Sequence, residues 1–268
     1  MKDNLRQRVQ REQHAHTDNV DVLDASYRLK NRFNHIWTYP SRQRFDDTLM
    51  RHLKSLNGAK VLDCGCGRGD MSLYILAQGG RVDGIDISPL YIQAAMDRCV
   101  TAGYDSSMFR FHVMDAHSMD FRSGIFDIVV GLGILHHLEF DVALHEIRRV
   151  LKPFGRLLLQ EPLANNPLLK VFRRFTPSAR TVDERPLTGN DIKRLKHSTE
   201  WNAEMCFCGL LEAPAAMMTS VLMPNRPNNL ILRITDKVER KLHHAGVLDA
   251  WNQYVLINLV KQPEAISS

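Results

Sequence analysis

Short apolar segments alternate with longer amphipathic segments in the middle of the chain, and this alternation limits the fold more than any other feature. The apolar segments, which we predict to be buried strands, cover residues 60–63, 82–87, 109–114, 125–131 and 156–160. The intervening segments 70–78, 88–103 and 141–151 have the length and periodicity of helices. Because parallel strands need crossover connections of this kind, the pattern predicts βαβ units and a parallel sheet.

Two further apolar segments, at 201–208 and 254–260, extend the expected sheet to seven strands. We therefore predict an α/β fold: a Rossmann-like, seven-stranded, mostly parallel sheet with a helical cap or lid. The chain divides into an N-terminal helical cap (1–56), a ligand-binding core (57–161), lid insertions that include strand six (162–250), and the last strand with a C-terminal tail (251–268).

A glycine-rich loop, DCGCGRG at residues 63–69, follows the first strand. Ligands of open α/β sheets bind at the carboxyl ends of the strands, and alternating glycines let the backbone approach a ligand with no Cβ in the way. The main competing interpretation is a dinucleotide dehydrogenase. Its G-x-G-x-x-G motif needs Gly or Ala at the position where this chain has Asp70, so we disfavour it.

Polar or small residues end the next three strands as well. Asp86 ends the second strand, where a carboxylate can accept hydrogen bonds from two ribose hydroxyls. Asp115 follows the third strand and suits an adenine amino group, while Gly131 ends the fourth and leaves room for the rest of a cofactor.

Five segments in the expected order resemble the class I methyltransferases that use S-adenosylmethionine (SAM). They are VLDCGCGRGD (61–70), GIDIS (84–88), VMDAHSMDF (113–121), FDIVVGLGILHHL (126–138) and LKPFGRLLLQEP (151–162). The resemblance implies SAM as the cofactor and 57–161 as a SAM-binding core. The residues that would contact SAM are Asp63, Gly65, Cys66, Gly67, Asp86, Ile87, Asp115, Ala116 and Gly131.

Three residues at the ends of the fourth and fifth strands are candidates for catalysis. Methyl transfer from a sulfonium is an in-line displacement that positioning alone can accelerate, but an acceptor with a proton to lose benefits from a base. His136 or His137 could be that base, although such a pair can also cap a helix and pack against the cofactor. Glu161 could orient the substrate or bond only to backbone.

The segments outside the core suggest a small, apolar or aromatic acceptor of a natural-product or quinone-like kind. Phe172 and Met218 belong to an oily lid, and Tyr27 and Tyr39 fall off the apolar stripe of the N-terminal helices, whereas Trp37 fits that stripe and is expected in the core. These four residues, without Trp37, are the candidates for acceptor binding. The alternative is that the lid segments form a dimer interface, so a homo-oligomer stays open.

Charge and composition speak against other partners. The net charge of +5 is scattered, so no nucleic-acid partner is expected. A protein or nucleic-acid methyltransferase and a non-catalytic SAM-binding protein are the remaining alternatives. The region after the fourth strand reads GLGI (131–134) and lacks the Asn/Asp-Pro-Pro-Tyr-like tetrad of amino-methylating nucleic-acid enzymes.

Cysteine spacing and hydropathy argue against a metal site and a membrane span. The two C-x-C pairs are too closely spaced for a typical zinc site, and five cysteines with a polar N-terminus suggest a reducing cytoplasm. The apolar segment 205–223 is interrupted by Glu212 and Pro214, so a strand followed by a helix is expected instead. The basic residues Lys170, Arg173 and Arg174 could make weak contact with a membrane surface.

Overall fold

The structure is a computed structural model that describes residues 7–13, 33–174, 184–244 and 248–263. Its centre is a seven-stranded sheet with the order β3-β2-β1-β4-β5-β7-β6. The strands are β1 (Lys60–Cys64), β2 (Arg81–Asp86), β3 (Phe109–Val113), β4 (Phe126–Leu132), β5 (Leu151–Pro162), β6 (Trp201–Cys208) and β7 (Tyr254–Lys261). The first five are parallel, and β7 runs antiparallel to both of its neighbours. The predicted seven-stranded, mostly parallel Rossmann-like fold is confirmed.

The order of the strands creates a switch point between β1 and β4. The chain passes outward from β1 to β2 and β3, then returns to place β4 on the other side of β1. The connections after these two strands therefore leave in opposite directions, and a crevice opens at their carboxyl ends.

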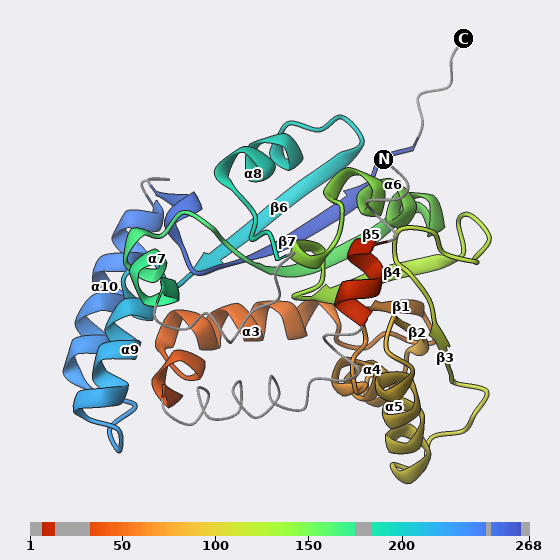
Figure 1. Cartoon of the computed structure of the whole chain (residues 1–268), viewed down its shortest axis with the longest axis horizontal. Helices are drawn as coiled ribbons and strands as arrows, with labels where there is room; N and C mark the ends of the chain where they lie inside the picture. Colours follow the sequence, from red (N-terminus) through yellow and green to blue (C-terminus); the bar gives the residue numbers. More distant parts are fainter. Residues whose placement is uncertain (1–6, 14–32, 175–183, 245–247, 264–268) are drawn as a thin grey trace.

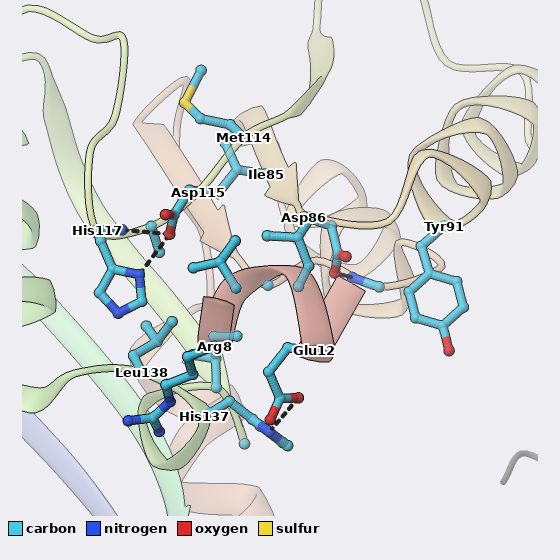
Figure 2. Close-up of a pocket in the computed structure, with 17 residues that line it drawn as sticks. Arg8, Glu12, Ile85, Asp86, Tyr91, Met114, Asp115, His117, His137 and Leu138 are labelled. Atoms are coloured by element: carbon cyan, nitrogen blue, oxygen red, sulfur yellow. Dashed lines mark hydrogen bonds and ion pairs between the residues drawn. The ribbon is translucent and has the colours of Figure 1, made fainter. Parts of the chain in front are cut away.

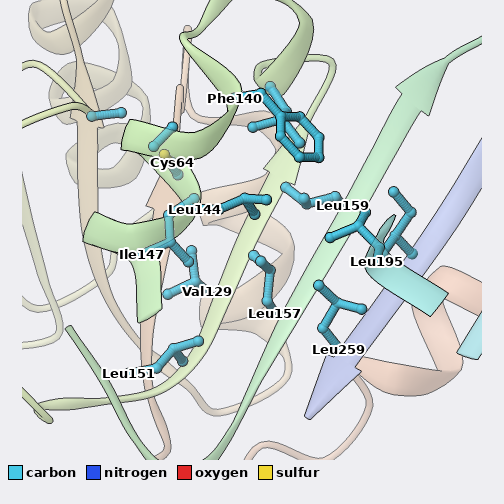
Figure 3. Close-up of a cluster of buried hydrophobic side chains, with 14 of the residues drawn as sticks. Cys64, Val129, Phe140, Leu144, Ile147, Leu151, Leu157, Leu159, Leu195 and Leu259 are labelled. Carbon is cyan, nitrogen blue, oxygen red and sulfur yellow. The ribbon is translucent and has the colours of Figure 1, made fainter. Parts of the chain in front are cut away.

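Helices cover both faces of the sheet (Figure 1). On one face lie α3 (Pro40–His52), α4 (Asp70–Ala77) and α5 (Pro89–Thr101), and on the other lie α6 (Phe140–Val150) and α8 (Gly189–Lys196). Strand side chains alternate between the two layers: Leu157 and Leu159 join one buried cluster and Leu158 joins the other (Figure 3). Each such side chain contributes about 2 kcal/mol to stability, so both layers hold the sheet in place.

Two predictions from the sequence were wrong: the start of the fifth strand and the burial of Trp37. The predicted strand begins at residue 156, but residues 152–155 also belong to β5, where the pairing with β4 shifts register between Phe126 and Ile128 and Phe154 adopts a φ of 61°. Trp37 was expected in the core but is 40% exposed at the end of η1 (Asn34–Trp37), because the chain forms a short 3-10 turn there instead of a regular helix. Pro40 is the first residue of α3, a position that favours proline because the first N–H groups of a helix have no partner within it.

The helices of the C-terminal part gather at one end of the sheet, where α7 (Pro167–Arg174), α9 (Glu212–Leu222) and α10 (Leu230–His244) lie beside η1 and α3 (Figure 1). The expected change from strand to helix within 205–223 is confirmed, since β6 ends at Cys208 and α9 begins at Glu212. Among the described residues, no helix combines the length and the hydropathy needed to cross a membrane.

A buried carboxylate joins these helices. Glu239 of α10 accepts hydrogen bonds from the Ser41 hydroxyl of α3 and from the backbone N–H groups of Gly209, Leu211 and Glu212, all at 2.8–3.0 Å. Four donors on one carboxylate compensate for its burial, so α3, α9 and α10 are held together at one point.

Candidate functional site

A cavity of about 180 Å³ opens at the carboxyl ends of β1, β2, β3 and β4 (Figure 2). Six of the predicted cofactor residues line it: Gly65, Gly67, Asp86, Ile87, Asp115 and Ala116. The other lining residues are Arg8, Val9, Glu12, Ile85, Tyr91, Met114, His117, Gly133, Ile134, His137 and Leu138. The cavity therefore coincides with the site that the strand ends predict.

The glycine loop needs its glycines for backbone geometry. Gly65, Gly67 and Gly69 have φ angles of 71°, 50° and 80°, which L side chains rarely adopt. A Cβ on Gly65 would also lie 2.7 Å from the Cδ1 atom of Ile134. Any side chain there would fill the floor of the cavity or distort the loop.

Asp86 ties the loop after β1 to the start of α5. Its Oδ2 accepts a hydrogen bond from the Gly67 N–H (3.0 Å) and its Oδ1 accepts one from the Ser88 N–H (2.9 Å). Each carboxylate oxygen has a second lone pair, so the group can receive these bonds and still accept from the hydroxyls of a ribose.

Asp115 is oriented by a histidine that the sequence did not single out. Oδ1 of Asp115 accepts hydrogen bonds from the backbone N–H (2.9 Å) and Nδ1 (2.6 Å) of His117, while Nε2 of His117 accepts from the Glu139 N–H (2.8 Å). Burial alone would raise the pKa of Asp115, but the bonds from His117 outweigh it and lower the pKa. An ionised Asp115 suits a donor such as the amino group of an adenine.

Three predicted cofactor residues lie beneath the cavity instead of in its wall. Asp63 is buried and accepts a 2.6 Å hydrogen bond from the Ser72 hydroxyl, and burial raises its pKa to about 6. Cys66 is buried as well, and burial raises the pKa of its thiol. A Cβ on Gly131 would collide with Ile134. Gly133, and not Gly131, lines the cavity.

Glu161 supports the turn that follows β4. Its fully buried carboxylate accepts hydrogen bonds from the N–H groups of Ile134 (3.0 Å) and Leu135 (2.8 Å), and from both the N–H (3.3 Å) and Nδ1 (2.8 Å) of His136. Of the two roles considered for Glu161, the geometry favours bonding to backbone, although the partner is η2 (Leu135–His137) and not the lid.

The two histidines occupy different places. His137 lines the cavity, with Nδ1 3.2 Å from Oε2 of Glu12 and Nε2 4.0 Å from Oε1 of Glu184. His136 lies behind it, with a ring centroid 4.1 Å from that of His137. Figure 2 shows His137 and Glu12 pointing toward each other.

The cover of the cavity comes from residues 7–13, a helical segment that crosses the open strand ends (Figure 2). Arg8, Val9 and Glu12 face the cavity, and the side-chain amide of Gln13 donates a 2.9 Å hydrogen bond to the Ile87 carbonyl. No motif marks these residues or Glu184, because their role depends on contacts with residues far away in the sequence.

The predicted acceptor residues do not meet at this cavity. Tyr39 is fully buried, donates a 2.9 Å hydrogen bond from its hydroxyl to Gln253, and packs against Leu169 and Ala213. It therefore supports the packing of α9, and its proposed contact with the acceptor was wrong. Met218 is 46% exposed on α9, away from the cavity.

Two acceptor candidates cannot be placed. Tyr27 and the side chain of Phe172 lie outside the described residues. Within the described part of 162–250 no residue lines the cavity, so the expected lid over it is not observed there.

Comparison with known proteins adds a family and a fold. A family model described as a methyltransferase domain matches residues 62–159. A demethylmenaquinone methyltransferase of Staphylococcus aureus (strain JH9) is 28% identical over 182 residues, which are 66% of this chain and 72% of that protein.

Two solved structures share the fold at low identity. Geranyl diphosphate C-methyltransferase from Streptomyces coelicolor A3(2), in complex with Mg²⁺, geranyl diphosphate and S-adenosyl-L-homocysteine, has a TM-score of 0.58 and 17% identity, and the match covers 82% of this chain and 79% of that one. Phosphoethanolamine N-methyltransferase 2 of Haemonchus contortus, in complex with SAM, has a TM-score of 0.60 and 17% identity, with 94% and 59% covered.

Proposed function

We propose that this class I SAM-dependent methyltransferase transfers the methyl group of SAM to a small, apolar or aromatic acceptor of the quinone type. The family membership rests on the glycine loop of residues 63–69, on the seven-stranded sheet and on the methyltransferase-domain match. The acceptor class is the part of the proposal that experiment must decide.

The observation that carries the cofactor site is the joint placement of Asp86 and Asp115 in one cavity with Gly65 and Gly67. In the arrangement we propose, Asp86 accepts hydrogen bonds from the ribose, Asp115 accepts one from the adenine amino group, and the glycine loop borders the methionine part. Asp63 assists from below, by holding the loop through its hydrogen bond with Ser72.

Two observations support an apolar acceptor. The wall of the cavity beside His137 contains Val9, Ile134 and Leu138, which offer apolar contact to a flat ring. The relative from Staphylococcus aureus is named for methylation of demethylmenaquinone. In our proposal the His137 side of the cavity is where the acceptor loses its proton before or during transfer.

The exposed face of α10 supports an acceptor that is reached at a membrane surface. Leu230, Ile234 and Val238 recur every four residues and are 64%, 52% and 43% exposed. The neighbouring row on the helix carries exposed Arg233 and Lys237. We propose that this stripe, defined as the apolar row 230/234/238 with its basic neighbours, rests against an anionic lipid surface.

A direct assay tests the function. The protein is incubated with SAM labelled in its methyl group and with a reduced naphthoquinone, a simple phenol, a peptide mixture or an oligonucleotide. We expect labelled product from the quinol and no transfer to the peptide or the oligonucleotide. Transfer to a macromolecule alone, or tight SAM binding without turnover on any of the four, would contradict the proposal.

A further inference from the structure

From the cysteine pairs alone, the sequence predicts no metal site, but we infer that His136, His137 and Glu184 form a binding site for a divalent transition-metal ion beside the cofactor cavity. Glu161 and Glu12 orient the two imidazoles of this site. One ligand atom from each of the first three residues can be chosen so that all lie within 4.8 Å of one another. The residues come from η2 and from the segment before α8, and Glu12 comes from the helical segment 7–13, so no sequence motif announces the site.

The spacing between His137 and Glu184 is too long for a hydrogen bond and leaves room for an ion. Nε2 of His137 lies 4.0 Å from Oε1 of Glu184, beyond the range of a hydrogen bond. An imidazole nitrogen and a carboxylate oxygen each bind zinc at about 2.0–2.2 Å, so a tetrahedral ion would draw the two atoms together to about 3.4 Å.

A carboxylate lies beside the Nδ1 atom of each imidazole. Nδ1 of His136 forms a 2.8 Å hydrogen bond with Oε2 of Glu161, whereas Nδ1 of His137 makes an ion-pair contact of 3.2 Å with Oε2 of Glu12. Donation from Nδ1 of His136 leaves the lone pair of that ring on Nε2. Histidines that bind metals usually have this arrangement, in which a carboxylate fixes the tautomer and the direction of the ring.

The charge of the side chains around the two histidines also favours a cation site. The side chains of Glu12, Glu161, Glu184 and both histidines are at most 16% exposed, so three carboxylates are gathered in a poorly solvated place. Arg185, the residue after Glu184, pairs with Asp191 at 3.1 Å. Three carboxylates in one poorly solvated place produce a negative potential that favours a divalent cation there.

Two imidazoles and one carboxylate define the class of ion. This donor set suits Zn²⁺, Fe²⁺, Co²⁺ or Mn²⁺ and leaves coordination positions open. His137 lines the cavity, so an open position can face the acceptor. Its use in catalysis rests on the proposed function: an ion there would favour loss of the acceptor's hydroxyl proton to water. The resulting anion then attacks the methyl carbon as the S–CH₃ bond breaks, with its electron pair left on sulfur.

Metal binding can be measured without any acceptor. The full-length protein is freed of metal with a chelator and titrated with CoCl₂ by absorption spectroscopy and with ZnCl₂ by calorimetry. We expect one equivalent to bind, with the visible absorption of Co²⁺ in a nitrogen and oxygen environment. His136→Asn and Glu184→Gln should weaken binding at least about 100-fold, and Glu12→Gln about tenfold, because losses of orienting partners typically cost 10–100-fold.

A matched control tests whether any histidine beside a carboxylate would bind the metal ion. His112 lies 3.4 Å from Asp83 on the sheet, away from the cavity, so His112→Asn should bind Co²⁺ as the unsubstituted protein does. SAM affinity, measured on each variant, reports whether the fold and the cofactor site are intact.

Two results would overturn the inference. One is the absence of stoichiometric Co²⁺ and Zn²⁺ binding, and the other is unchanged binding by a Glu184→Gln variant that still binds SAM. Methyl transfer that persists in the presence of a chelator would then leave the proposed function standing while the metal site fails.

Discussion

Asp86 accepts hydrogen bonds from the glycine loop and from the residue before α5, and in our proposal the same carboxylate binds the ribose of SAM. We predict that Asp86→Ala weakens SAM binding at least about 100-fold, since hydrogen bonds to charged groups are worth about 1.5–3 kcal/mol each. Calorimetry with SAM checks this. Asp70→Ala is the matched control: Asp70 follows the same loop but pairs with Arg98 at the surface, and its loss should change SAM affinity little.

Glu212 gives the stability of the protein a defined dependence on pH. Burial raises its pKa from 4.5 to about 7, with the nearby carboxylate of Glu239 adding to the effect and a hydrogen bond from the Ser41 N–H opposing it. Between these values the folded chain holds a proton that the unfolded chain has lost. Stability therefore falls by up to about 3 kcal/mol as pH rises from 4.5 to about 7.

Urea unfolding at about pH 5 and about pH 8 checks this dependence. We predict that Glu212→Gln removes the part of the decline that Glu212 causes and leaves the part caused by Asp63, whose pKa is also raised, so that the variant gains stability relative to the unsubstituted protein at the higher pH. Equal slopes for the two proteins would show that Glu212 keeps an ordinary pKa.

For single residues, the sequence predicts the position of side chains that belong to a local motif and does not predict the position of those that lie outside one. Asp86 and Asp115 follow predicted strands directly, so their position needs only the strand boundaries. Glu12 and Glu184 contact His137 from segments far away in the chain. Tyr39 was misassigned because burial by α9 is a tertiary contact that helical periodicity does not contain.

Among the helices and strands, α10 allows a prediction that does not depend on the cofactor site. Both acidic residues of this helix, Asp236 and Glu239, are buried, so its exposed charges are basic. We predict that the protein sediments with vesicles containing phosphatidylglycerol at low salt and less so at high salt, because exposed charges are screened. The double substitution Ile234→Glu with Val238→Glu should lower the bound fraction at least about tenfold.

Val100→Glu provides the control for this prediction. Val100 is 61% exposed on α5, at the opposite end of the molecule from α10 (Figure 1), so one added negative charge there should leave vesicle binding intact. If the unsubstituted protein does not bind vesicles and instead forms a dimer that the α10 substitutions dissociate, the stripe is a protein interface.

The elements of the core could be predicted because each strand and helix carries its own periodicity. The bounds of β6 agree with the prediction at both ends, and α5 (Pro89–Thr101) begins one residue after the start of the predicted segment 88–103. The extent of β5 could not be predicted, since Pro153 and Gly155 look like a turn in sequence and lie in an irregular stretch between Leu151 and Arg156, both of which pair with β4. The positions of α9 and α10 depend on contacts with η1 and α3 and were not foreseen.

For the molecule as a whole, cofactor binding should couple to global stability. A ligand at about 100 times its Kd stabilises a folded protein by about 2.7 kcal/mol, which corresponds to a rise in Tm of roughly 5–10 °C for a chain of this size. Thermal unfolding with and without SAM measures it, with NADH as the control that should produce no shift. The Asp86→Ala variant should lose the SAM-dependent rise, and a rise that persists in it would place SAM elsewhere.

The position of β7 affects how the protein folds during its synthesis on the ribosome. This strand is the last of the seven to be synthesised, yet it lies between β5 and β6 and pairs with both. Until residue 261 has emerged, the nascent chain therefore exposes one edge of β5 and leaves β6 without its neighbour. Such open edges invite pairing with other chains, so we expect chaperones to engage the nascent protein late, after β6 has appeared and before translation ends.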